Sequence, residues 1–238
     1  MPPRFTAGGE VFNMDDKKKT DKGWKRAFDK DNSFNLILSR IGTLIIANIL
    51  FVVGCIPIVT IGVSLSALNA VMFDFQRNDD VKVSSVFFKT YKENIISGIV
   101  GFILDMGFLS MGIVGLIISF RAENLVLMFI GFVIFGTITF AALCFLAFYF
   151  GIIARYENDL PTLVKNGLIV GIAYVRWGVL IWLLWISVIG LFYIFPVLLV
   201  YTGFVFAMLG FSFMAYVTTR IHRRVFRLVD DREVTDNY

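Results

Sequence analysis

Long stretches without a charged residue constrain this chain more than any other feature of its sequence. No Asp, Glu, Lys or Arg occurs from 41 to 73, from 125 to 154 or from 177 to 219, and Asp105 is the one exception between 94 and 120. A helix of about 20 apolar residues crosses a bilayer, whereas an open sheet would leave backbone groups unpaired there. The sequence therefore predicts an all-α fold, a polytopic integral membrane helix bundle.

Composition narrows the class of function further. Hydrophobic residues make up 58% of the 238 positions and charged residues only 17%, against about 25% in a typical soluble domain. His222 is the single histidine, and Cys55 and Cys144 stand at no metal-binding or redox spacing. A His-based catalytic triad, a multi-His metal site and a disulfide framework are therefore disfavoured. We expect a non-enzymatic protein with no cofactor and no metal.

Six membrane-spanning helices are expected: Phe34–Ile56, Thr60–Phe75, Asn94–Phe120, Leu125–Ala154, Leu163–Tyr193 and Pro196–Thr219. Pro57 and Pro196 break the apolar runs, because proline lacks the amide donor and clashes with the preceding turn. Pro57 and Gly62 are assigned to a tight turn, and Pro196 to a second structural turn. The second helix is short and carries the polar Asn69, so it is either a full span or a re-entrant helix.

Basic residues predict the orientation of the chain. All of the 22 Lys and Arg residues except Arg40, Arg121 and Arg176 fall in four segments: before the first helix, between the second and third, after the fourth, and after the sixth. Six spans place these four segments on one side, which the positive-inside rule makes cytoplasmic. We therefore expect a multi-pass plasma membrane protein with both termini inside. Its parts are a cytoplasmic tail (1–33), a transmembrane domain (34–219) and a basic cytoplasmic extension (220–238).

Two aromatic groups mark candidate surfaces on the cytoplasmic side. Trp24 and Phe28 stand one helical turn apart, which indicates either a short interfacial helix or a solvated tail with one anchor. Phe87, Phe88 and Tyr91 form an apolar stripe beside two lysines. This stripe packs against the bilayer and the other helices, or it is a docking surface for a second protein. The basic residues after 219 are expected to meet anionic lipid headgroups, and no nucleic acid is expected as a partner.

Polar residues inside the predicted spans are the candidates for intramembrane function. Asp105 lies about eleven residues along its helix, about 16 Å deep at 1.5 Å per residue, and a buried carboxylate usually faces a partner or a wet cavity. Asn48 and Asn69 are expected at similar depth, which suggests a polar cluster with Asp105 in the inner leaflet. Arg176 either pairs with Asp105 or marks the inner interface, with Leu163–Val175 as an elbow helix.

One part of the chain resembles a known family. The segments Asn48–Asp74 and Val83–Ile95 are similar to the YesL-like family, a bacterial membrane domain of unknown function (number 624). The resemblance rests on three motifs, at Ile56–Gly62, Ser66–Leu68 and Phe87–Asn94. It implies a bacterial membrane protein found beside carbohydrate uptake ABC systems. No catalytic residue is established for that family, so none is carried over.

These observations favour a non-catalytic accessory membrane subunit. Such a protein would bind the permease subunits of a carbohydrate (oligosaccharide) ABC importer within the lipid bilayer, and would stabilise or regulate them. The chain has no phosphate-binding GxxxxGK[ST] loop, which is the signature of the transporter ATPase itself. The alternative is a stand-alone small secondary transporter or channel, which needs a polar route across the whole bilayer. An intramembrane enzyme would need convergent catalytic groups, and the scattered polar residues do not supply them.

Overall fold

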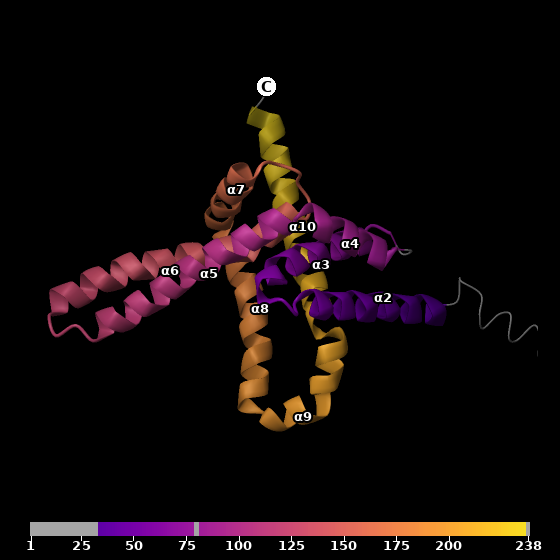
Figure 1. Ribbon diagram of the computed structural model, residues 1–238, viewed down its shortest axis with the longest axis horizontal. Helices are drawn as coiled ribbons and strands as arrows, with labels where there is room; N and C mark the ends of the chain where they lie inside the picture. Colours follow the sequence, from indigo (N-terminus) through magenta and orange to yellow (C-terminus); the bar gives the residue numbers. More distant parts are fainter. Residues whose placement is uncertain (1–32, 79–80, 237–238) are drawn as a thin grey trace, which may run out of the picture. The chain divides into compact units, whose positions relative to one another are not determined.

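The computed structural model describes residues 33–78 and 81–236, and every regular element within them is helical (Figure 1). The chain divides into two units, residues 1–42 and 43–238. The described residues of the first unit are the opening turns of helix α2. All packing described below lies within the second unit.

The described helical elements, in chain order, are α2 (Ser33–Gly54), η1 (Ile58–Thr60), α3 (Ile61–Phe75), α4 (Val83–Glu93), α5 (Ile95–Phe120), α6 (Leu125–Ile153), α7 (Leu160–Ala173), α8 (Val175–Ile194), α9 (Pro196–Val205), the π-helical segment η2 (Phe206–Gly210) and α10 (Phe211–Asp236). Six stretches are long and apolar enough to cross a bilayer: Ile37–Gly54, Ile58–Phe75, Ile95–Phe120, Leu125–Ile153, Val175–Ile194 and Val200–Asp231. These lengths and compositions confirm the predicted all-α, six-span class.

Helix α3 is the most buried of the six candidate spans. Over Ile58–Phe75, 67% of the residues are buried, against 11% over Val175–Ile194. Helices α4, α5, α6 and α10 all contact it, so its apolar side chains are covered on several sides. The stretch of 18 residues extends about 27 Å, close to the roughly 30 Å of a hydrocarbon core. Its length favours a full span over the re-entrant alternative.

The turn before α3 uses Pro57 as the sequence assigns, whereas Gly62 lies inside α3 rather than in the turn. Pro57 has an extended backbone, with ψ at 118°, and precedes the short helix η1. The Thr60 hydroxyl lies 2.7 Å from the Pro57 carbonyl oxygen and closes the turn. Gly62 then lies against the backbone of α5, where a Cβ atom would collide with the carbonyl oxygen of Gly98. These two glycines let α3 and α5 cross at close range.

Helices α5 and α6 form a long antiparallel hairpin and lie side by side (Figure 1). The Asn124 side chain starts α6, because its Oδ1 accepts a hydrogen bond from the Val126 amide at 2.8 Å. Glycines of α5 lie against larger side chains of α6 in the pairs Gly101–Tyr149, Gly112–Thr139 and Gly115–Phe135. This fit of small against large residues lets the two helices approach closely.

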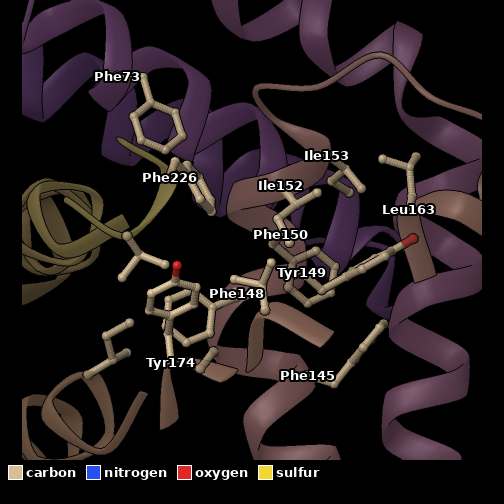
Figure 2. Close-up of a cluster of buried hydrophobic side chains, with 14 residues drawn as sticks. Phe73, Phe145, Phe148, Tyr149, Phe150, Ile152, Ile153, Leu163, Tyr174 and Phe226 are labelled. Carbon is tan, nitrogen blue, oxygen red and sulfur yellow. The ribbon is translucent and has the colours of Figure 1, made fainter. Parts of the chain in front are cut away.

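The second half of α6 forms an aromatic core with α3, α7 and α10 (Figure 2). Phe148 and Tyr149 are fully buried, and the Tyr149 hydroxyl donates to the Ser97 carbonyl oxygen at 2.9 Å. From the other side, the rings of Phe73 and Phe226 approach to 6.1 Å between centroids. The core therefore joins helices that are more than a hundred residues apart in the sequence.

The prediction of one continuous helix over Leu163–Tyr193 is wrong. Helix α7 ends at Ala173, and Tyr174 has φ −114° and ψ 32°, outside the helical region, before α8 begins. The two pieces pack differently on α6, because Gly171 of α7 lies against the Cys144 backbone while Gly178 of α8 faces Phe148. The helix is therefore interrupted at Tyr174, between the two pieces.

The last helix continues beyond the predicted bilayer boundary at residue 219. Pro196 stands in the first turn of α9, and α10 runs unbroken from Phe211 to Asp236, through the predicted boundary at 219. His222, Val225 and Phe226 are buried on one face of this continuation. The basic extension, which was expected to meet lipid headgroups, therefore also packs into the helical core.

Candidate functional site

Asn48 joins α2 to the π-helical segment η2. Its side chain is fully buried; its Nδ2 donates to the Ala207 carbonyl oxygen, and its Oδ1 accepts from the Ser212 amide at 2.9 Å. A π turn disturbs the regular backbone ladder and leaves groups in need of partners. Asn48 supplies both a donor and an acceptor to that stretch. The polarity of Asn48 is thus used in packing between helices.

Asn69 lines a cavity of about 290 Å³ between α3, α6, α8 and α10. Thr218 and His222 from α10 line the same cavity, together with the indoles of Trp182 and Trp185 from α8. The His222 Nε2 lies 2.8 Å from the Ala147 carbonyl oxygen, so this nitrogen carries the hydrogen. Within the described part of the chain, the Thr218 hydroxyl and the His222 Nδ1 have no hydrogen-bond partner. The cavity is a mostly apolar pocket with three polar groups.

Asp105 lies in a different groove, on the face of α5 that packs against α6 and α7. Its side chain is 2% exposed, and neither carboxyl oxygen has a hydrogen-bond partner among the described residues. The groove has a volume of about 250 Å³ and is lined by Leu104, Asp105, Phe108, Ile138, Ala141, Ala142, Phe145, Val164 and Leu168. Asp105 is the only polar residue in that lining. The structure therefore leaves a carboxyl group surrounded by hydrocarbon.

The predicted polar cluster of Asn48, Asn69 and Asp105 does not form. Asn48 is bonded to the backbone of η2 and α10. Asn69 lines the tryptophan-lined cavity, and Asp105 borders the α5–α6–α7 groove. Counting residues along each helix gives similar depths, but depth alone does not specify which direction each side chain points. No hydrogen bond joins any two of the three within the described residues.

Arg176 does not pair with Asp105. It is exposed in the first turn of α8, and its guanidinium lies 5.8 Å from the ring centroid of Trp177. Helix α8 has 20 residues, about 30 Å, and therefore spans a hydrocarbon core without help from α7. This geometry favours the interfacial arginine with a preceding elbow helix.

The aromatic stripe of α4 is divided between core and surface. Phe87 is 1% exposed and Phe88 is 51% exposed, although their rings meet at 5.8 Å between centroids. Tyr91 stacks on Phe87 at 5.9 Å. Phe87 therefore anchors α4 to the core, and Phe88 is available at the surface. The expected interfacial residues Trp24 and Phe28 lie outside the described residues.

Sequence reasoning missed the role of His222, which it used only to exclude catalysis. Gly151 of α6 makes room for the imidazole, since a Cβ at this glycine would come within 2.5 Å of Nδ1. The rings of Phe148 and Phe226 flank it at 5.4 and 5.6 Å. The available signal was helical spacing, because Thr218, His222 and Val225 recur on one helical face at the start of the basic run.

These features define the class of protein: a multi-pass helical membrane protein with isolated polar groups in apolar surroundings. Residues 44–120 match the model of a family described as "Protein of unknown function, DUF624". The match confirms the resemblance to the YesL-like family and extends from α2 through α5, so it includes Pro57, Gly62 and Asp105. No curated protein and no solved structure matches the chain.

Proposed function

We propose that this protein is a non-catalytic accessory subunit of the plasma membrane. It associates with the permease subunits of a carbohydrate ABC importer and stabilises or regulates them. Its basic helix ends and both termini face the cytoplasm in this proposal, in keeping with the positive-inside rule. The carbohydrate context comes from the family resemblance alone.

The observation that carries the proposal is the separation of the intramembrane polar groups. Asn48 is hydrogen-bonded to backbone groups, and Asp105 lies in an otherwise apolar groove. The cavity at His222 is a third site, separate from both. A transporter needs a polar route across the bilayer, whereas an accessory subunit needs lateral surface. Helices α5 and α8 and the first half of α6 supply that surface, since most of their residues are not buried.

The direct test is co-purification of the full chain from its native membranes under gentle solubilisation. A tagged copy at native expression level is extracted in a mild detergent or a polymer nanodisc, and its partners are quantified by mass spectrometry. We expect permease subunits of a carbohydrate importer to be enriched over a control pulldown with an unrelated polytopic protein carrying the same tag. Elution as a lone monomer, with the permease left in the flow-through, would contradict the proposal.

A stand-alone small transporter or channel is the second candidate, and the cavity at His222 is the observation that favours it. That cavity holds three polar side chains and two indoles, a composition compatible with a small polar ligand. The test is substrate flux in liposomes that contain this protein alone. Sugar uptake above that of empty liposomes, and its loss in His222→Phe, would support this candidate over the accessory subunit.

A further inference from the structure

The carboxyl group of Asp105 lacks a partner in either charge state. Both of its oxygens are buried without a hydrogen bond among the described residues. As a carboxylate it has no counter-ion, and as the neutral acid its O–H has no acceptor. Either condition is unfavourable in hydrocarbon, where ionisable groups normally pair with one another or with backbone carbonyls. The described part of this chain therefore supplies no partner for the Asp105 carboxyl group.

The groove around Asp105 has the form of a lateral docking site. It is bounded by α5, α6 and α7, and residues at its rim are exposed: Leu104 by 38%, Phe108 by 51% and Leu168 by 41%. The carboxyl oxygens of Asp105 lie beneath this rim and are covered in the structure, so a partner reaches them only when the apolar lining moves aside. An apolar rim over one acidic group is complementary to an apolar helix with one basic side chain. Arg176, which the sequence offers as a partner for Asp105, instead lies exposed beside Trp177.

The depth of Asp105 suits a basic side chain that enters from the basic side of the membrane. Helices α5 and α6 have 26 and 29 residues, about 39 and 43 Å, and therefore exceed a hydrocarbon core of roughly 30 Å. Counted from the hairpin loop, Asp105 lies about 22 Å along α5, in the far third of that core. A Lys or Arg anchored at the opposite interface reaches this depth with its long apolar stem.

We propose that the α5–α6–α7 groove receives a membrane-spanning helix of the partner subunit, and that a Lys or Arg of this helix forms an ion pair with Asp105. This inference rests on the proposed function, because it names the surface through which the accessory subunit contacts the permease. This ion pair supplies the partner that the Asp105 carboxyl group lacks, and it specifies the register of the partner helix. Pairing of opposite charges across an interface provides this kind of selectivity.

The test places a photo-crosslinking amino acid at Phe108, on the rim of the groove, in the full-length protein in native membranes. A second position, Ile189 on α8, is 64% exposed and serves as the off-site control. We expect the Phe108 position to capture a partner peptide that contains Lys or Arg within a transmembrane helix. Asp105→Asn should reduce this capture about thirtyfold or more, as removal of one member of a buried charge pair does. Asp105→Glu should retain most of it.

Controls separate a failed interaction from a failed fold. Asp105→Asn should melt at or above the wild-type temperature in detergent, because the amide removes an unpaired carboxyl. Charge exchange, with Asp105→Lys in this chain and the captured basic residue changed to Asp, should restore crosslinking.

Three outcomes overturn the inference while the proposed function stands: equal capture by Asp105→Asn, permease contact without any Phe108 crosslink, or a Phe108 crosslink to lipid or to a second copy alone. If neither crosslinking nor co-purification finds a permease, both proposals fall.

Discussion

Buried polar side chains in this protein differ in how fully the chain itself satisfies them. Asn48 has both a donor and an acceptor partner. His222 has one partner, the Ala147 carbonyl oxygen, while Asp105 has none within the described residues. In hydrocarbon, water does not compensate a missing partner. The satisfied Asn48 therefore indicates packing, whereas the unsatisfied Asp105 is the position at which the proposed partner supplies the missing group.

We predict that Asn48→Ala destabilises the protein by about 1–3 kcal/mol. Two hydrogen bonds to the η2–α10 backbone are lost, and each is worth about 0.6 to 1.7 kcal/mol within membranes. The free energy of unfolding in mixed micelles measures the effect. Thr202→Ala is the matched control, because the Thr202 hydroxyl is exposed and bonds only its own helix at Leu198. Equal stability of the two variants would show that the contact of Asn48 with η2 is unimportant.

Cys55 is expected to react with alkylating reagents only at elevated pH. Burial raises the pKa of the Cys55 thiol, so the reactive thiolate forms at higher pH than the value of about 8.5 for a free cysteine. In a Cys144→Ala background, we expect the alkylation rate to reach half its maximum above that value. Glu123→Cys in a background without native cysteines is the exposed reference. A Cys55 midpoint at or below that of the reference would refute the prediction.

At the scale of helices, the crossing of α3 and α5 depends on glycine. A Cβ at Gly98 would lie 2.7 Å from the Val63 Cα and 2.8 Å from its amide nitrogen, and a backbone cannot move aside as a flexible side chain can. The crossing places the most buried span beside the helix that carries Asp105. Any change that separates these two helices also alters the groove.

Gly98→Ala should therefore cost about 1–3 kcal/mol of stability, the range for overpacking a tight contact. Gly107→Ala is the control on the same helix, because no atom lies within 4 Å of the added Cβ. That change should be neutral or stabilising by up to about 1 kcal/mol, since alanine favours the helix. Thermal unfolding in detergent compares the two. A similar melting temperature for both variants would rule out a close α3–α5 crossing.

The sequence predicted the helices well where a local signal exists. Charge-free runs, Pro57 and Pro196 specify the spans and turns, and these agree with the structure. The interruption at Tyr174 has no proline or glycine to mark it and depends on how α7 and α8 pack against α6. It could be anticipated only as one of two alternatives for Arg176.

The candidate sites were less predictable because they depend on distant contacts. Asn48 and Ser212 are 164 residues apart, and no periodicity in either segment specifies that they meet. Asp105 was identifiable, since a single carboxylate in an apolar run stands out. The lack of a partner for Asp105 was not predictable, because it depends on which residues of α6 and α7 surround the carboxyl group.

For the whole molecule, the distribution of basic residues and the six spans describe one topology. The α4 segment and the continuation of α10 share one side of the membrane in this account, and the α5–α6 loop at Arg121–Asn124 lies on the other. Docking of a permease at the groove depends on this six-span topology, because a basic side chain from the cytoplasmic side reaches Asp105 only if α5 crosses the bilayer in the stated direction.

The most direct measurement is labelling of single cysteines by a membrane-impermeant maleimide, in a chain without Cys55 and Cys144. Lys89 has a side chain that is 71% exposed on α4, and Glu123 is exposed in the α5–α6 loop. The account predicts that Glu123→Cys reacts in intact cells and that Lys89→Cys reacts only after permeabilisation. Labelling of Lys89→Cys from outside intact cells would contradict the six-span topology.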